Sequence, residues 1–288
     1  MKKKMRSKRR KTRRLEWAVF FAAFFVSLSL LSYGVILLIQ ENEGREAQQL
    51  AQMHTATQPV IHAVPVSETA TQQPATVPPE TAQPSETTLP VETTAPQMLS
   101  NMQELYRKNP DIAGWIKIDG SNIDYAVMHT PSDPEKYLHL NFDQKYSFGG
   151  LPFIDANCGM DPESDNLLIY GHNMQNGTMF RDLMYYDTKT FWENHKTIRF
   201  STLYEEREYQ IVAAFYDRVY FPEEDCFKFY QFIDAADREE FDTAIAYFKE
   251  KSLYDTGVTA EYGDSLISLV TCAYHVSDGR FVVVAKKV

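Results

Sequence analysis

The 288-residue chain contains only three cysteines, Cys158, Cys226 and Cys272, and only 12 glycines. Three thiols are too few for a disulfide-rich scaffold, and an odd number leaves at least one thiol unpaired. There is no glycine-rich phosphate-binding motif and no metal-ligand spacing, and we interpret the acidic residues within 161–165 as a solvated loop. The sequence therefore predicts no cofactor and no metal ion.

Aromatic residues are missing from residues 41–97, which also hold eight of the 14 prolines. The part from Thr69 to Pro96 is rich in Pro, Thr, Glu and Gln, and this composition cannot bury enough apolar surface to fold. We interpret residues 41–97 as a disordered linker that acts as a spacer. Two histidines, His54 and His62, fall within it.

Basic residues gather at the N-terminus, where residues 1–14 carry ten of the 29 Lys and Arg and no acidic residue. The apolar run Trp17–Ile39 follows, and its 23 residues are enough to span a bilayer as a helix. A signal peptide would have a shorter apolar core and a cleavage site, so we predict an uncleaved anchor over residues 15–40. The basic flank predicts a cytoplasmic N-terminus and an extracellular C-terminal domain on a single-pass membrane protein.

The rest of the chain is acidic. Without those ten basic residues, 19 Lys and Arg remain against 39 Asp and Glu. Phosphate binding needs a basic face, so nucleic acid is excluded as a partner. An acidic body also has no attraction to anionic lipid, and contact with the membrane would depend on the anchor alone.

Residues 98–288 carry 32 of the 38 aromatic side chains, enough for one sizeable core. Helices are predicted over 101–108, 180–194 and 235–253, the last with an apolar stripe of Phe241, Ile245, Phe248 and Leu253. Strands are predicted at 115–118, 123–128, 151–154, 166–170, 197–201, 208–216, 266–273 and 280–286. Many short strands with inserted helices favour one mixed β-barrel over a parallel α/β sheet.

A thiol at the end of one strand precedes a guanidinium at the start of the next. Cys272 closes the run 268–272, and Arg280 opens the following run after a short polar turn. If the two strands form a hairpin centred near Val276, Cys272 and Arg280 are directly opposite and share one face. Such a pair suits attack on a carbonyl, because negative charge develops on the oxygen as sulfur bonds to carbon.

A nucleophilic thiol also needs a group that exchanges a proton. His172 follows the apolar run 166–170, and its imidazole titrates near neutrality, so we predict it as the general acid–base group. His275 is the rival, three residues from Cys272. The other histidines of the domain are interpreted as structural: His129, His139 and His195. From these patterns alone, a buried structural Cys, a surface His and a strand-edge Arg also stay open as alternatives.

The chain resembles the class B sortases over about residues 98–288. The matching segments are Asn109-Pro-Asp-Ile-Ala-Gly-Trp115-Ile-Lys-Ile118, Tyr170-Gly-His172-Asn-Met174, Thr271-Cys272 and Asp278-Gly-Arg280-Phe-Val-Val-Val-Ala285. The sequence departs from the family pattern at Val270, where a small hydroxyl residue is common, and at Tyr274, where an acidic residue can occur. The departures concern fine substrate contacts, and the chemistry is unaffected.

The resemblance implies a closed eight-stranded sortase-type β-barrel with an N-terminal helical extension, and His172, Cys272 and Arg280 as catalytic residues. It implies a membrane-anchored cysteine transpeptidase that cleaves a C-terminal sorting signal of secreted proteins, of the Asn-Pro-x-Thr-Asn or Ser/Asn-Pro-x-Thr-Gly kind. A thioester acyl-enzyme would form, and an amine of lipid II or peptidoglycan would resolve it. The insertion before the Cys272 strand would wall the substrate groove, with Tyr170 and Leu138 as substrate-binding residues on the other side.

Three other functions stay open at this point. A pilin-polymerising sortase would use a Lys of another pilin subunit as acceptor, and a plain cysteine peptidase would use water. A catalytically inactive surface binding module would have an unreactive Cys272. A disulfide between Cys158 and Cys226 is a further open question.

Overall fold

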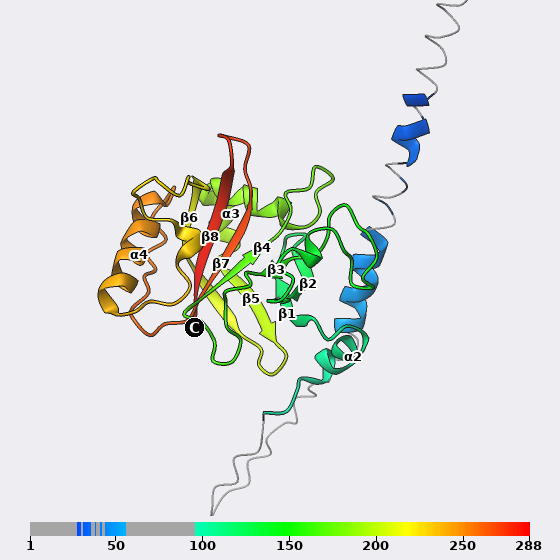
Figure 1. The fold of residues 1–288 in the computed structure, drawn as a ribbon, viewed down its shortest axis with the longest axis horizontal. Coiled ribbons are helices and arrows are strands. Elements are labelled where there is room, and N and C mark those ends of the chain that lie inside the picture. The colour runs from blue at the N-terminus through cyan, green and yellow to red at the C-terminus, as the bar shows by residue number, and fades with distance from the viewer. Residues whose placement is uncertain (1–27, 30, 36–37, 39–40, 42–43, 56–95) are drawn as a thin grey trace, which may run out of the picture.

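The computed structural model describes residues 28–29, 31–35, 38, 41, 44–55 and 96–288. Its main body is a closed β-barrel of eight strands in the order β1-β2-β3-β4-β7-β8-β6-β5, as predicted (Figure 1). Antiparallel pairing of β1 with β5 closes the barrel. The strands are β1 (Ile112–Lys117), β2 (Asp124–Met128), β3 (Phe153–Ile154), β4 (Asn166–Tyr170), β5 (Thr197–Thr202), β6 (Glu208–Arg218), β7 (Leu266–Cys272) and β8 (Gly279–Lys287).

Strands β4 and β7 are mostly apolar and show no alternation of apolar and polar residues. Four of the five residues of β4 and six of the seven residues of β7 are buried, so both faces of these strands are covered. A strand covered on both faces shows no alternation of apolar and polar residues. The two strands pair in parallel, from Asn166 opposite Leu266 to Tyr170 opposite Val270. Their carboxyl ends therefore meet at one edge of the barrel.

The helices differ from the prediction in two places. Helix α2 (Ser100–Lys108) is present, but the predicted helix over 180–194 consists of the 3₁₀ helix η2 (Phe180–Asp187) and α3 (Lys189–Asn194). The two are separated by Thr188, whose backbone is extended. Helix α4 (Arg238–Lys251) ends before Leu253, which is 46% exposed and is no part of the buried stripe. The first turn of α4 is capped by Asp237, which accepts a hydrogen bond from the Glu240 amide.

A helix over residues 44–55 lies against the barrel beside α2, so the prediction of a disordered linker over 41–97 is wrong for these residues (Figure 1). The residues that face the domain recur at helical spacing: Ala47, Leu50, Ala51 and His54. The His54 ring stacks on Trp115 at a centroid distance of 4.4 Å. Its Nε2 lies 3.0 Å from Nδ2 of the buried Asn101. Burial lowers the pKa of His54 to about 4, so the docked ring is neutral.

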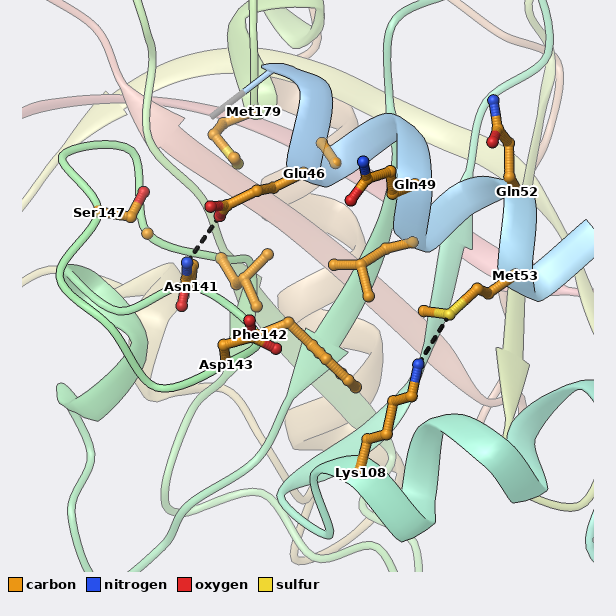
Figure 2. A pocket seen from close by; sticks show the side chains of 14 residues that line it. Glu46, Gln49, Gln52, Met53, Lys108, Asn141, Phe142, Asp143, Ser147 and Met179 are labelled. Carbon is orange, nitrogen blue, oxygen red and sulfur yellow. Dashed lines mark hydrogen bonds between the residues drawn. The ribbon is translucent and has the colours of Figure 1, made fainter. Parts of the chain in front are cut away.

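Figure 2 shows this helix spanning a pocket of about 590 Å³ between itself and the barrel. Two hydrogen bonds join the helix to the domain across this pocket. Asn141 Nδ2 donates to Glu46 at 2.6 Å, and Lys108 Nζ donates to the Met53 sulfur at 2.9 Å. The Glu46 contact attaches the helix to the loop between η1 (Lys136–Leu138) and β3.

None of the helices among the described residues has the length and apolar content required to cross a membrane. The predicted anchor over residues 15–40 lies largely outside those residues, as does the part of the predicted linker from 56 to 95, His62 included.

Candidate active site

The predicted register of the hairpin is confirmed, because Cys272 pairs with Arg280 at the open end of the β7–β8 ladder. The turn between them is tight. A side chain at Gly279 would collide with the carbonyl oxygen of Ala273 and the ring of His275. The guanidinium of Arg280 donates from Nη1 to the Gly279 carbonyl at 3.0 Å. The hairpin thus places a thiol and a guanidinium on neighbouring strands, on one face.

The parallel pairing of β4 with β7 brings His172 to the same edge. Tyr170 is the last residue of β4 and lies opposite Val270. His172 and Cys272 are therefore each two residues beyond a paired position. The connection is maintained by Gly171, whose amide donates to the Val270 carbonyl at 3.0 Å and whose carbonyl accepts from Thr271 Oγ1 at 2.7 Å. The spacing of His172 and Cys272 is therefore set by the backbone pairing at the ends of β4 and β7.

A cavity of about 660 Å³ joins all five predicted site residues, since His172, Cys272, Arg280, Tyr170 and Leu138 all line it. This volume is within the range of sites that bind small molecules or short peptide segments. The insertion between β6 and β7 contributes three of the residues that line the cavity: Val219, Phe229 and Tyr230.

His172 is held by the loop that follows η1. Its Nε2 lies 3.0 Å from the Leu138 carbonyl oxygen, and its ring stacks on His139 with centroids 5.4 Å apart. Burial lowers the pKa of His172, the Leu138 carbonyl opposes this shift, and the positive charge of a protonated His139 adds to it. Within the described residues there is no hydrogen bond between His172 and Cys272. Such contacts are often long before a substrate binds.

Tyr170 lines the cavity, and its hydroxyl donates to Asp155 Oδ2 at 3.2 Å. Burial raises the pKa of Tyr170, Asp155 raises it further, and Arg280 opposes the rise. The phenol is therefore neutral and available only for hydrogen bonding or packing.

One residue of this site was missed by the sequence prediction. Asn173 is 8% exposed, and its Nδ2 donates to the Cys272 carbonyl at 2.8 Å. Its Oδ1 accepts from Arg181 Nη1 at 3.2 Å. Asn173 therefore fixes the backbone of Cys272 across the sequence distance that separates β4 from β7. In the sequence, the only indication that Asn173 belongs to the site is its position directly after His172.

The other thiols and histidines lie elsewhere. All three cysteines are free, so Cys158 and Cys226 form no disulfide in the described part of the chain. Cys158 is buried, and its burial raises the pKa of the thiol to about 12. His275, the rival base, is exposed in the turn and packs against Tyr216 at a centroid distance of 4.8 Å. It does not line the cavity.

Two of the acidic residues within 161–165 form an ion pair or a hydrogen bond with other parts of the domain. Glu163 forms an ion pair with Arg207 at 2.6 Å, and Asp165 accepts a hydrogen bond from the Ala235 amide. Over the ranges that the structure describes, no group of three or more His, Cys, Asp and Glu side chains is arranged to hold a metal ion.

Comparisons with known proteins point to one family. The family model of the sortase domain matches residues 116–288. Sortase B of Staphylococcus aureus (strain NCTC 8325 / PS 47) is 30% identical over 193 residues, which is 64% of this chain and 73% of that protein. Sortase B of Listeria monocytogenes serovar 1/2a (strain ATCC BAA-679 / EGD-e) is 28% identical over 194 residues, or 67% of this chain and 76% of that protein.

Solved structures show the same relationship. A Staphylococcus aureus sortase B–substrate complex superposes with a TM-score of 0.59 at 28% identity, covering 66% of this chain and 86% of that chain. A Bacillus anthracis protein described as similar to sortase B has a TM-score of 0.64 at 23% identity, over 86% of this chain and 96% of that one, and shows the fold. These matches define a cysteine transpeptidase, and the chain belongs to the sortase family. Its sortase B relatives place it in class B.

Proposed function

We propose that this sortase is anchored in the cell membrane by residues 15–40, with its N-terminus in the cytoplasm and its catalytic domain outside. Its substrates would be secreted proteins with a C-terminal sorting signal of the Asn-Pro-x-Thr-Asn or Ser/Asn-Pro-x-Thr-Gly kind. It would join them to an amine of lipid II or peptidoglycan. The observation that carries the proposal is the cavity in which Cys272, His172 and Arg280 meet.

In the first half-reaction the Cys272 thiolate attacks the carbonyl carbon of the signal's Thr. Arg280 is opposite Cys272 in the ladder and stabilises the oxyanion that forms. The C–N bond breaks, His172 gives a proton to the departing amine, and a thioester remains on Cys272. Because its pKa is lowered, the imidazolium of His172 is a strong proton donor, although a smaller fraction of His172 is protonated in the free enzyme.

In the second half-reaction an acceptor amine attacks the thioester carbon. His172 takes the proton of the attacking amine, Arg280 again stabilises the oxyanion, and the thiolate leaves. The C–S bond is exchanged for a new amide, so no external energy source is needed. Two related structures support the choice of test ligands: a sortase B–substrate complex, and a sortase B complexed with triglycine.

The sorting-signal peptide would lie between two walls. Leu138 and Tyr170 would form one side, and three residues of the β6–β7 insertion would form the other. Those three, Val219, Phe229 and Tyr230, line the same cavity as Leu138 and Tyr170. Tyr230 is held by its own hydroxyl, which lies 3.2 Å from the Tyr220 carbonyl oxygen and accepts from the Tyr220 amide. A wall fixed in this way suits selection among peptides, whereas the chemistry depends on the barrel edge.

The test is product analysis with full-length protein in detergent, a panel of sorting-signal peptides, and triglycine as amine acceptor. We expect a ligated product that contains the signal up to its Thr, and free acid when triglycine is omitted. Cys272→Ala should give neither product, whereas Cys226→Ala, which removes an exposed thiol, should match the parent. Hydrolysis alone, with or without triglycine, would indicate a cysteine peptidase. No cleavage of any peptide would refute the proposed substrate class.

A further inference from the structure

The loop segment 136–150, which begins with η1, contacts the His172 ring both at its edge and on its face. In the plane of the ring, Nε2 meets the Leu138 carbonyl oxygen at 3.0 Å. On the face of the ring, His139 stacks with an interplanar angle of 20°. His139, which the sequence analysis treated as structural, thus directly contacts the predicted acid–base group.

This loop is fixed from several sides. The Tyr137 hydroxyl donates to Asp111 at 2.8 Å and accepts from Asn109 Nδ2 at 2.7 Å. The Ser147 amide donates to the His139 carbonyl at 3.0 Å, which ties the far end of the loop to its start. The backbone of Leu138 and His139 is therefore held by the fold, and the exposed His139 ring lies on His172.

Gly150 shows how closely the loop closes on itself. It has a φ of +56°, and a side chain there would collide with the carbonyl oxygens of Tyr137 and Leu138. The second of these is the oxygen that contacts His172. Glycine is therefore required at 150 for two reasons: the left-handed backbone, and the space needed by the acceptor of the His172 bond.

A carbonyl oxygen can only accept a hydrogen bond, so Nε2 of His172 must carry a hydrogen whenever this contact exists. In the neutral ring the lone pair is then on Nδ1, and protonation occurs there. We propose that His139 is a positioning residue that, together with the Leu138 carbonyl, holds His172 as the Nε2–H tautomer and makes Nδ1 the nitrogen that exchanges protons in the reaction. The role assigned to Nδ1 rests on the proposed function, whereas the tautomer does not.

His139 also acts on the charge of His172, because two stacked imidazoles resist being positive together. In agreement, the charge of His139 contributes to the lowered pKa of His172, after burial. Other ionisable groups face the same region. Glu135, Asp155, Tyr170, Cys272 and Arg280 line the cavity, and Tyr146 lies against the His139 ring at 6.1 Å. A variant that alters His139 alone leaves all of these in place.

The experiment follows the ring nitrogens of His172 by NMR in full-length protein with ¹⁵N-labelled histidine, in detergent. The signal is assigned by its loss in His172→Gln. In the parent protein we expect the Nε2–H tautomer. In His139→Phe, which retains a stacking ring without a charge, the His172 titration should move to higher pH. The acid limb of the kcat/KM profile should move in the same direction.

The matched control is His195→Phe, because His195 also stacks on an aromatic ring, Phe191, at 3.9 Å, but does not line the cavity. It should leave the His172 titration unchanged. Gly150→Ala should lose the tautomer preference and about 10-fold in kcat/KM through displacement of the Leu138 carbonyl. If His139→Phe does not fold, His139→Gln provides the same test of charge.

An Nδ1–H tautomer in the parent protein, or an unchanged His172 titration in a folded His139 variant, would overturn the inference. Failure of the proposed function looks different. In that case no sorting-signal peptide would be cleaved, while the tautomer and the titration shift would still be measurable.

Discussion

Cys272 and Arg280 are opposed partners at the last position of the β7–β8 ladder, where the two strands part into the turn. Residues directly opposite each other in an antiparallel pair have side chains on one face, with Cβ atoms about 5 Å apart. Backbone pairing therefore starts the Arg280 side chain directly beside that of Cys272. In the proposed mechanism this relationship makes the identity of the cation at 280 important, because its donors would have to reach the oxyanion that forms on the carbonyl oxygen when the sulfur attacks the carbon.

For Arg280→Lys we expect a loss of about 10²-fold or more in kcat/KM, because an ammonium cannot reproduce the planar fork of donors at this position. Sorting-peptide cleavage gives the rate, and the melting temperature checks the fold. Arg199→Lys is the matched control, since Arg199 is an exposed strand residue that pairs with Asp119 and does not line the cavity. Full activity in Arg280→Lys would show that the reaction needs only a positive charge at position 280 and not the guanidinium.

The choice between two histidines can be decided by a pair of variants. His172→Ala should lose about 10²–10⁴-fold in rate, as expected when a positioned acid–base group is removed. His275→Ala should lose little, because His275 is exposed in the turn and packs on Tyr216. The measurement is single-turnover cleavage under conditions in which both variants are folded. The reverse ranking would transfer the role to His275.

Asn173→Ala tests the contact that the sequence did not reveal. Without Nδ2, the Cys272 carbonyl loses its partner and the end of β7 is less well fixed. We expect a loss of about 10- to 100-fold in kcat, as is typical of small misplacements of a nucleophile, together with a stability loss of about 1–3 kcal/mol. Asn176→Ala, which changes an exposed turn, is the control. Unchanged kcat with reduced stability would limit Asn173 to a role in folding.

The strand pattern and the hairpin register were predictable, because strand periodicity and turn length are local properties of the sequence. The contacts around His172 were not. Asn173, His139 and Gly150 reach the site through pairing of distant strands and through a loop held by Tyr137. The helix over 44–55 was missed because most of the residues that face the domain are small or polar, such as Ala47, Ala51 and His54. Its docking depends on Trp115, which is remote in the sequence.

Docking of this helix should depend on pH. The pKa of His54 is lowered to about 4 in the docked state, against 6.5 for a free imidazole. The undocked state therefore binds more protons between these values, so docking is at full strength above about pH 6.5 and weakens as the pH falls towards 4. Hydrogen exchange of residues 44–55 across this window measures the effect.

The control for this pH dependence is His54→Phe, which retains a ring against Trp115 but cannot be protonated. Its exchange should change much less over the same pH range. Equal protection of residues 44–55 in the parent protein at pH 7 and pH 4 would show that His54 remains neutral for another reason or that the helix is held by its other contacts.

The central claim is that Cys272 is the nucleophile of a transpeptidase, and peptide mass spectrometry of the trapped acyl-enzyme tests it most directly. Full-length protein is mixed with a sorting-signal peptide without acceptor, quenched in acid, and digested. The account predicts one acyl adduct, ending at the Thr of the signal, on the peptide that contains Cys272, and its disappearance when triglycine is added before the quench. An adduct on Cys226 or Cys158, or cleavage by Cys272→Ala with no adduct at all, would contradict it.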